Sequence, residues 1–509
     1  MEKNNPVALI ILDGFGYRKE KKYNAIAHAR MPHFNAWWNT YPHALLAASG
    51  KAVGLPDNMI GNSEVGHLAI GAGRTLDQPM KIWLDAIANH SFDQNKIMQK
   101  EFERLVSVGG RLHVIGLLSD AGVHGHEKQI YAVIDAAVKA GIKKIIVHPI
   151  LDGRDVAPQS AYEYLYRLEQ LAKQYNNGYV SIGSLHGRFY AMDRDHHWDR
   201  VEKSYRVLTE GWQDSYESWE KILERHYAHN ITDEFIMPTQ LCADAIIHNG
   251  DGIIFCNVRP DRARQLTMCF VQPEKIPFII KPLNLIFFIT PVNYGDNIKT
   301  TVLFKRDPIP NTLKDIFAEH GKTIFTIAET EKYAHVTYFF RGEEEAPVAT
   351  EERHMIHSIA AKGYVTQPEM RAQEITQAVI ESLRNNAADF YLINYANADM
   401  VGHSGNFGAT IKAIEFLDKQ LGVLYNEIVE KQSGTLYITA DHGKAEDMFD
   451  EITHQPKTAH TNNEVPFLMI KNGMENGGQL GLKELADIAP FILQNMGIAV
   501  PSEMQKSNL

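Results

Sequence analysis

One pattern recurs along the 509 residues of the sequence: a short β-branched or aromatic run, then a cluster of Gly, Asp, His or Arg, then an amphipathic stretch. This alternation is typical of α/β folds, in which each strand of a parallel sheet is followed by a helix. The clearest runs cover residues 7–12, 112–118, 144–150, 253–258, 390–395 and 435–439. Because open parallel sheets bind ligands at the carboxyl ends of their strands, we expect these clusters to converge on active sites, although one cluster alone is more often a turn.

Length and composition narrow the classes of protein that fit. The chain is about three times as long as a domain of ~150 residues, which predicts two or three folded units. Its 44% hydrophobic and 22% charged residues are typical of a globular protein. The 51 Lys and Arg against 62 Asp and Glu give a net charge of −11. Such a balance argues against unselective binding to nucleic acid or to an anionic membrane, and it still allows a local basic pocket.

The sequence contains no recognisable targeting or membrane-spanning segment. Asp13 interrupts the first apolar run before it reaches the length of a signal-peptide core, and residues 276–290 include Lys281, Pro282 and Asn284. The three cysteines form neither a CxxC pair nor a disulfide framework: Cys242, Cys256 and Cys269. We therefore expect a soluble protein of the reducing cytoplasm.

Three familiar motifs fail at a defining glycine. Lys19 stands where a dinucleotide fingerprint beginning at Gly14 needs its third glycine. Ile316 stands where a P-loop ending at residues 321–323 needs its first glycine, and Val65 stands where a nucleophile elbow around Ser63 needs its last. A Rossmann cofactor site, a P-loop and an α/β-hydrolase are therefore disfavoured.

Metal-type ligands gather at the two ends of the chain. Asp399 and His403 are four residues apart, a spacing that places both on one face of a helical turn. The pair at 441 and 442 shares one ion only if the chain turns there, which the following glycine permits. Each such residue alone is more often structural than metal-binding. Together they favour a metal site: Asp13, Asp399, His403, Asp441, His442 and His460. Carboxylate and imidazole ligands without thiolates suit Mn²⁺, Zn²⁺ or Mg²⁺.

Ser63 is the candidate nucleophile for such a centre. Two adjacent divalent ions suit phosphoryl transfer, because they polarise the phosphoryl oxygens and lower the pKa of an attacking hydroxyl. Ser63 lies on a turn that we expect to open a helix, where the partial positive charge of the helix end favours an anion. The alternative at this point is that Ser63 is an ordinary N-cap or turn residue.

Ten motifs occur in a fixed order over nearly the whole chain and carry a resemblance to a known family. They include LeuAspGlyPheGly at 12–16, GlyAsnSerGluValGlyHis at 61–67 and AspHisGly at 441–443. The other seven cover residues 120–126, 151–155, 187–195, 257–265, 329–336, 399–403 and 460–463. The sequence closely resembles the cofactor-independent phosphoglycerate mutases, which are members of the alkaline phosphatase superfamily.

The resemblance implies a set of ligands and substrate-binding residues. One divalent ion would be held by Asp13, Ser63, Asp441 and His442, and the other by Asp399, His403 and His460. Mn²⁺ is the expected metal, and Mg²⁺ or Zn²⁺ also fits these ligands. The family's substrate site maps onto His124, Arg154, Asp155, Arg188, Arg194, Arg259, Arg262 and Lys332. Arginine suits a substrate that carries a phosphate and a carboxylate, since its planar fork binds both groups through paired hydrogen bonds.

The resemblance also implies a reaction. The chain would interconvert 3-phosphoglycerate and 2-phosphoglycerate, a step of glycolysis and gluconeogenesis, through a phosphoserine at Ser63 and without bisphosphoglycerate. Asp155 would move protons to and from the glycerate hydroxyls, His124 would position them, and Lys332 would neutralise charge on the transferring group. We expect a monomer that binds this small substrate and neither nucleic acid nor a membrane.

The order of the motifs predicts the architecture. Metal-type residues come from both ends of the chain and most arginines from its middle, so we expect a discontinuous phosphatase-like metal-binding domain (1–77 and 311–509) with an inserted substrate-binding domain (78–310). Prolines at 79, 308 and 310 interrupt regular structure near the two crossings. As in the family, both domains would be doubly wound α/β units that face each other across a cleft and move at the crossings.

Two departures from the family pattern and two other functions remain open. Lys444 replaces the family's asparagine after AspHisGly and adds charge beside the metal ligands, and Arg341-Gly342-Glu343 replaces AsnGlyGly. A phosphatase or phosphodiesterase would share the metal set but lack the arginines, and a binding protein would lack an intact nucleophile. Taken singly, each arginine also fits a surface ion pair with a nearby acid.

Overall fold

Strand β1 (Val7–Leu12) lies inside an eight-stranded sheet of the computed structural model, which describes residues 5–175, 178–210, 216–295, 297–305, 307–360, 363–385, 388–451, 454–475 and 477–505. All six residues of β1 are buried, as expected for a parallel strand covered on both faces. The sheet order is β12 (Glu351–Ile356), β11 (Ile324–Glu329), β13 (Phe390–Tyr395), β1, β14 (Thr435–Thr439), β17 (Val465–Ile470), β2 (Pro42–Leu46) and β18 (Gly478–Gln479).

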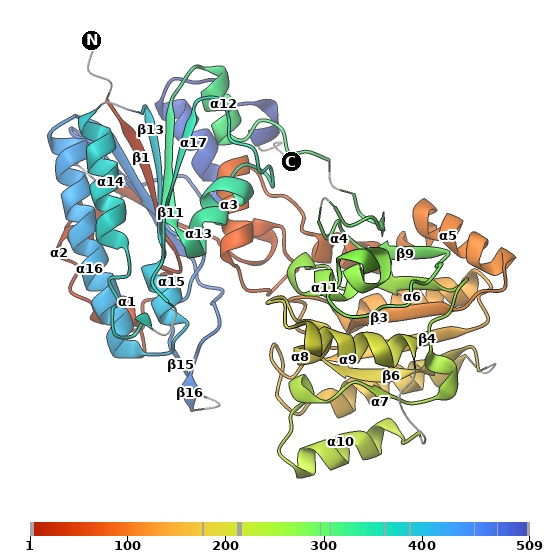
Figure 1. The fold of residues 1–509 in the computed structure, drawn as a ribbon. Helices are drawn as coiled ribbons and strands as arrows, with labels where there is room; N and C mark the ends of the chain where they lie inside the picture. The colour runs from red at the N-terminus through yellow and green to blue at the C-terminus, as the bar shows by residue number, and fades with distance from the viewer. Residues whose placement is uncertain are drawn as a thin grey trace. The chain divides into compact units, whose positions relative to one another are not determined.

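The five strands from β12 to β14 in this order are parallel to one another, and β17 is antiparallel to both β14 and β2. Figure 1 shows this sheet between two helical layers. One layer contains α2 (Pro32–Thr40), α14 (Ala372–Arg384) and α16 (Phe407–Tyr425). The other contains α3 (Ser63–Ala72), α12 (Leu313–Glu319) and α17 (Ile488–Asn495). A short hairpin, β15 (Phe449–Asp450) and β16 (Gln455–Pro456), extends from the loops after β14.

A second sheet has the order β10 (Thr301–Val302), β9 (Phe287–Thr290), β8 (Gly252–Phe255), β3 (Leu112–Leu117), β4 (Ile145–Leu151), β6 (Ser184–Gly187) and β7 (Thr239–Gln240), with β5 (Val180–Ile182) also paired to β4. Only β7 is antiparallel to its neighbour. The flanking helices are α4 (Pro79–Ala88), α5 (Lys96–Ser107), α6 (Glu127–Lys139), α7 (Ala161–Gln174), α8 (Arg188–Ala191), α9 (Trp198–Thr209), α10 (Trp219–Ala228) and α11 (Pro260–Val271).

The chain forms two compact units, each built around one of these sheets. The first unit comprises Met1–Asp77 and Asp307–Leu509, and the second comprises Gln78–Arg306. Pro79 occupies the first turn of α4, where its missing N–H costs no hydrogen bond. The first unit is therefore discontinuous in sequence.

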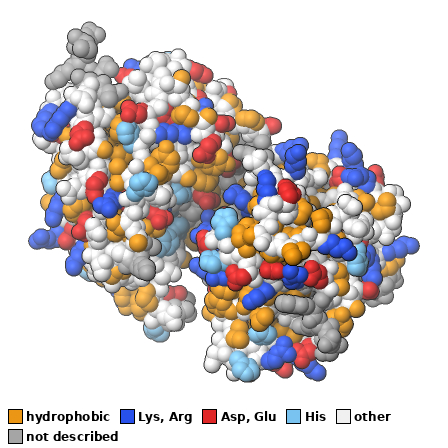
Figure 2. All heavy atoms as spheres, in the orientation of Figure 1, with side chains coloured by type: hydrophobic (Ala, Val, Ile, Leu, Met, Phe, Trp, Pro, Cys, Tyr) orange, Lys and Arg blue, Asp and Glu red, His pale blue; other side chains and the backbone are white. Residues whose placement is uncertain are grey.

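The α/β class expected from the sequence is confirmed, because the six β-branched runs each contain a parallel strand. The run at 253–258 contributes a shorter strand than its composition predicts, since β8 ends at Phe255. Figure 2 shows acidic and basic side chains interspersed over the visible face of each unit. Among the described residues, no helix combines the length and apolar character that crossing a membrane requires.

Candidate active site

The candidate ligands of the first unit lie at the carboxyl ends of neighbouring parallel strands. Asp13 directly follows β1, and Asp399 lies on α15 (Asn397–Gly402) after β13. Asp441 and His442 follow β14, and Lys332 lies on α13 (Thr330–Ala334) after β11. Because β11, β13, β1 and β14 are adjacent in the sheet, residues more than 400 positions apart meet at one edge, as the rule for open parallel sheets predicts.

Ser63 is the first residue of α3 and is buried, with 4% of its surface exposed. Its hydroxyl Oγ lies 3.1 Å from Asp13 Oδ1, 3.0 Å from His442 Nε2 and 2.7 Å from Lys332 Nζ. The N-cap of α3 is Asn62, whose side chain accepts a hydrogen bond from the Val65 amide. Since Asn62 caps the helix, the reading of Ser63 as an ordinary N-cap residue is wrong, and its hydroxyl faces the acidic cluster instead.

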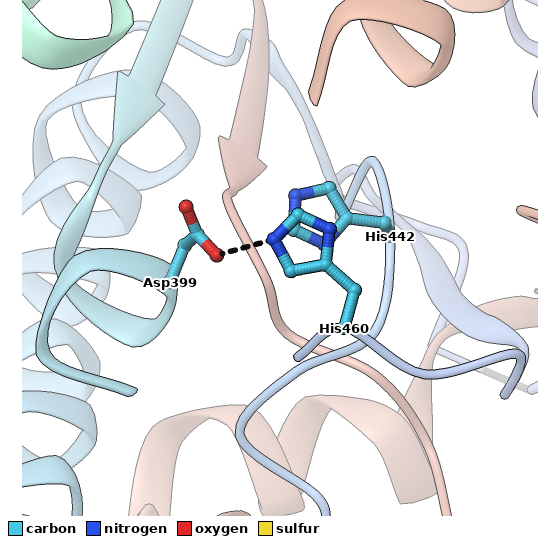
Figure 3. A group of neighbouring side chains, drawn as sticks. All are labelled: Asp399, His442 and His460. Carbon is cyan, nitrogen blue, oxygen red and sulfur yellow. Dashed lines mark ion pairs between the residues drawn. The ribbon is translucent and has the colours of Figure 1, made fainter. Parts of the chain in front are cut away.

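Two histidine side chains converge on Asp399 Oδ1. His403 Nε2 lies 3.1 Å from this oxygen and His460 Nε2 lies 3.3 Å from it, the contact drawn in Figure 3. The other ring nitrogens donate to backbone carbonyls, since His403 Nδ1 lies 2.8 Å from the Thr458 oxygen and His460 Nδ1 lies 2.9 Å from the Gly61 oxygen.

With Nδ1 as the donor, each Nε2 presents a lone pair, and the two Nε2 atoms are only 3.0 Å apart. Two lone pairs and a carboxylate oxygen directed at one point fit a cation, and the backbone hydrogen bonds fix the orientation of both rings as outer-shell partners of metal ligands do. Asp399 Oδ1 has no hydrogen-bond donor among the described residues, which agrees with this fit. The residues present therefore fit a divalent metal.

A second convergence surrounds His442. Its Nε2 lies 3.4 Å from Asp13 Oδ1 and 3.6 Å from Asp441 Oδ2, and all three side chains are fully buried. Burial alone would lower the pKa of His442, but Asp441 and Asp13 outweigh it and raise the pKa to about 9. Asp399, His442 and His460 bring ligand atoms within 4.8 Å of one another, as do Asp13, His67 and Asp441. All seven predicted metal ligands thus lie in one connected cluster.

Lys332 lies among the carboxylates. Its buried ammonium is 2.6 Å from both Asp13 Oδ1 and Asp399 Oδ2. Burial alone would lower the pKa of Lys332, but these carboxylates raise it above its usual value. Burial would likewise raise the pKa of Asp13, but Lys332 and His442 hold it well below the usual value. The lysine is therefore charged, and Asp13 is ionised.

The two glycines of the motif at 12–16 allow other chain segments to pack closely against them. Gly14 has a φ of +74°, and a Cβ atom there would lie 2.8 Å from Asp399 Cα. A Cβ at Gly16 would lie 2.3 Å from the Glu446 carboxylate, which accepts a hydrogen bond from the Gly16 amide. Gly443 was expected to permit a turn, but its φ is not positive; a Cβ there would instead lie 2.2 Å from Thr461 Oγ1.

Three residues that sequence reasoning missed hold this centre together. Glu446 is fully buried and accepts from the amides of Gly16 and Lys444 and from Asn463 Nδ2, tying three loops to one carboxylate. Asn394, at the end of β13, donates to Asp13 Oδ2 and lies 3.0 Å from His67 Nε2.

His67 occupies the position four residues after Ser63, on the same helix face. Its Nδ1 lies 2.8 Å from the Ser63 carbonyl oxygen and 3.2 Å from Asp441 Oδ2. Since its Nε2 contacts Asn394, both ring nitrogens have partners. His67 therefore links α3 to the Asp441 loop. The four-residue spacing of Ser63 and His67 in the motif at 61–67 was the sequence signal that could have identified His67.

The two departures from the family pattern have defined surroundings. Lys444 is fully buried, its ammonium donates to the Lys457 carbonyl oxygen, and burial lowers its pKa. Arg341 donates to Asp315 Oδ1 and to the carbonyl of Ala346, so it fastens the loop that follows it.

The predicted substrate residues of the second unit form a cluster of their own. Arg188 is 3% exposed and donates to Asp152 Oδ1 at 2.5 Å and to Asp155 Oδ2 at 2.6 Å. Asp261 pairs with Arg194 at 2.9 Å and with Arg259 Nε at 3.3 Å. Arg154 pairs with Glu234, and Arg262 donates to the Met192 carbonyl oxygen. Burial, together with Arg194 and Arg188, lowers the pKa of Arg262, which shows how densely positive charge is packed here.

His124 lies within this cluster and is uncharged. Burial, followed by the nearby Arg188, lowers its pKa to about 2. Its Nδ1 is buried and has no hydrogen-bond partner among the described residues, the closest acid being Asp261 at 3.8 Å. A neutral imidazole with a free ring nitrogen suits the positioning of a hydroxyl rather than proton transfer near neutral pH.

Comparisons with known proteins agree with this geometry. Residues 5–500 match the model of the metalloenzyme superfamily. The chain is 44% identical to the 2,3-bisphosphoglycerate-independent phosphoglycerate mutase of Legionella pneumophila, with 99% of this chain and 98% of the relative covered. It is 43% identical to the enzyme of that name from Synechococcus, with 99% and 95% covered. A solved structure of Leishmania mexicana phosphoglycerate mutase at low cobalt concentration matches with a TM-score of 0.77 and 30% identity, over 99% of this chain and 97% of that chain.

Proposed function

Since the chain belongs to the 2,3-bisphosphoglycerate-independent phosphoglycerate mutases of the metalloenzyme superfamily, we propose that it interconverts 3-phosphoglycerate and 2-phosphoglycerate through a phosphoserine at Ser63. The observation that carries this proposal is the surroundings of Ser63 Oγ, which lies within 3.1 Å of Asp13, His442 and Lys332. A buried hydroxyl among a carboxylate, an imidazole and an ammonium is arranged as an activated nucleophile.

The metal ligands proposed are those of the two convergences. Asp13, Ser63, Asp441 and His442 would hold one divalent ion, and Asp399, His403 and His460 the other, with Mn²⁺ as the expected metal. Bound there, the ions would lower the pKa of the serine hydroxyl and polarise the phosphoryl oxygens.

In the first half of the reaction, Ser63 would react with its hydroxyl proton already lost, and it is regenerated in that ionised form at the end of the second half. Its Oγ forms a bond to phosphorus, and the bond from phosphorus to the glycerate oxygen breaks. The leaving oxygen takes a proton from Asp155, our candidate for the acid, which would take up that proton when Arg188 exchanges it for the substrate. The Lys332 ammonium, 2.7 Å from Ser63 Oγ, offsets negative charge as it develops on the phosphoryl oxygens. The N-terminus of the ten-residue helix α3 stabilises the phosphoserine in the same way.

In the second half, the other glycerate hydroxyl returns its proton to Asp155 and attacks phosphorus, and the bond to Ser63 Oγ breaks. The arginines would hold the glycerate carboxylate throughout, and His124 would orient the hydroxyls. No proton or phosphoryl group is gained or lost overall, so no bisphosphoglycerate is needed. We propose that the protein acts as a cytoplasmic monomer.

A phosphatase of the same superfamily is the nearest alternative, and the arginine cluster argues against it, because hydrolysis has no need to retain glycerate. One assay separates the two. The purified protein receives Mn²⁺ and 3-phosphoglycerate without bisphosphoglycerate, and 2-phosphoglycerate and free phosphate are both followed. We expect 2-phosphoglycerate to dominate; predominant release of phosphate would favour the hydrolase, and no turnover would favour a binding protein.

A further inference from the structure

A continuous chain of polar side chains crosses the interior of the second unit's sheet. We call it the polar relay; its members are Arg111, Asp251, His113, His148, Ser184 and His186. They come from the starts of β3 and β8, from β4 and from β6. The side chains of His113, His148, Ser184 and His186 are at most 1% exposed.

Short contacts connect each member to the next. Arg111 donates to both Asp251 oxygens, and His113 Nε2 lies 3.2 Å from Asp251 Oδ2. His113 Nδ1 lies 2.9 Å from His148 Nε2. The Ser184 hydroxyl then lies 2.7 Å from both His148 Nδ1 and His186 Nε2. A Cβ atom at Gly183, next to Ser184, would lie 2.4 Å from Ile146 Cγ2 and 2.9 Å from Ala245 Cβ, so glycine allows close packing at this point.

The hydrogen bonds of the polar relay run in one direction. Asp251 accepts from Arg111 and is ionised, so His113 must donate to it from Nε2. His113 Nδ1 then accepts from His148 Nε2, and His148 Nδ1 accepts from the serine hydroxyl. The Ser184 oxygen finally accepts from His186 Nε2. Burial lowers the pKa of all three histidines, that of His186 to about 3, so each ring is neutral. The direction of the hydrogen bonds then places the single proton of each ring on Nε2.

The last member lies next to the substrate cluster. His186 is two residues before Arg188, and its buried Nδ1 has no hydrogen-bond partner among the described residues. The backbone pairs β6 with β4 at two register positions, Ile150 with His186 and Leu151 with Gly187, and the Gly183 amide just before β6 donates to the Val147 carbonyl oxygen. β4 leads directly into Asp152, the carboxylate that binds Arg188 at 2.5 Å. The polar relay therefore joins the two strands whose ends carry this ion pair.

We propose that the polar relay is a positioning device for the reaction: it fixes β6 against β4 and so holds Arg188 where the anionic substrate binds. This inference rests on the proposed function, because it takes Arg188 as a substrate ligand. Buried polar groups that lose their partners destabilise the fold, so a shift of β6 against β4 that broke these contacts is disfavoured. The relay residues themselves touch no substrate.

The test compares variants of the full-length enzyme. Ser184→Ala removes the hydroxyl that hydrogen-bonds to the imidazoles of His148 and His186. We expect KM for 3-phosphoglycerate to rise about fivefold or more, while kcat stays within about twofold of the wild-type value. Ser184→Thr restores the hydroxyl and should return KM to the wild-type value. Thr290→Val is the matched control, because Thr290 makes one buried hydroxyl contact, to Thr300, in the same sheet. It should lower the melting temperature and leave KM unchanged.

Histidine ¹⁵N NMR supplies an independent measurement, in which His113, His148 and His186 should all show the Nε2–H tautomer at pH 7. An Nδ1–H tautomer or a charged ring at any of them overturns the relay. Unchanged KM in Ser184→Ala, or an equal rise in Thr290→Val, overturns the positioning role while wild-type turnover stands. A wild-type enzyme that turns over no phosphoglycerate overturns the proposed function and this inference together. If Ser184→Ala does not fold, His186→Ala makes the same comparison.

Discussion

The two units present their charged side chains in contrasting ways. In the first, Asp13, Asp441 and His442 are fully buried and directed at one another. In the second, the side chains of Arg154 and Arg194 are 57% and 47% exposed and pair with acids, whereas Arg188 is 3% exposed. Buried carboxylates and imidazole lone pairs at fixed positions favour cations, whereas exposed guanidinium groups can exchange a carboxylate partner for a phosphate or carboxylate of a ligand.

This contrast predicts a separation of kinetic effects. Changes in the first unit should act on the chemical step and therefore on kcat. Changes to the arginines of the second unit should act on substrate retention and therefore on KM, whereas Asp155, the candidate acid of that unit, should act on kcat. The experiments below test that separation, beginning with the largest expected effect.

Replacing Ser63 with alanine should reduce turnover by about 10⁵-fold or more, since no other hydroxyl can accept the phosphoryl group at that position. Calorimetry should show that 3-phosphoglycerate still binds, because the arginines are untouched. Ser49→Ala is the matched control, as its hydroxyl makes one contact, to the Asn462 carbonyl oxygen. Substantial mutase activity in Ser63→Ala would exclude the phosphoserine route.

Replacing Lys332 with methionine should lower kcat about 10²- to 10³-fold, because the ammonium is lost from beside the reacting oxygen. KM should change little, and metal content should be retained, since the variant removes a positive charge from beside Asp13 and Asp399. Steady-state kinetics and elemental analysis provide the two readouts. A rise in KM with unchanged kcat would contradict the assignment of Lys332 to the chemical step.

Replacing Arg262 with alanine should raise KM about 10- to 100-fold with a smaller change in kcat, as expected for loss of a charged hydrogen bond to an anion. Arg225→Ala is the control, because Arg225 lies in the same unit and pairs with Glu217 at the surface. Equal effects of the two substitutions would remove the distinction between the cluster and ordinary surface arginines.

The smallest expected effect concerns stability rather than catalysis. Lys314 is fully buried beside Glu351, and burial lowers its pKa to about 8. Between about pH 8 and 10.5 the unfolded chain binds the proton that the folded chain has released, so this group makes stability rise with pH. Lys314→Met should abolish that contribution. Thermal unfolding of both proteins between pH 7.5 and 9.5 measures the difference, and identical slopes would contradict it.

The sequence predicted those parts of the molecule that local patterns encode. β-branched runs predict the parallel strands, and the polar residues directly after them include Asp13, Asp441 and His442. Glu446 and Asn394 could not be found this way, because their partners Gly16 and His67 lie 430 and 327 residues away along the chain.

The polar relay escaped sequence reasoning for a related reason. His113 and His148 lie inside runs that are otherwise apolar, so the pattern predicts only buried strands there. Their connection arises from the lateral pairing of β3 with β4, which places Ile115 opposite His148 and brings the two rings together. Strand order and register carry that information, and neither is visible in a single strand.

The central claim is that Ser63 carries the phosphoryl group between the two halves of the reaction. The most direct measurement is rapid acid quenching of the Mn²⁺-loaded enzyme during turnover of 3-phosphoglycerate, followed by mass spectrometry of the peptide that contains Ser63. The account predicts a phosphate on Ser63 that forms and disappears within one turnover. Full turnover with no phosphate on Ser63 at any time point, or with phosphate on another residue, would contradict it.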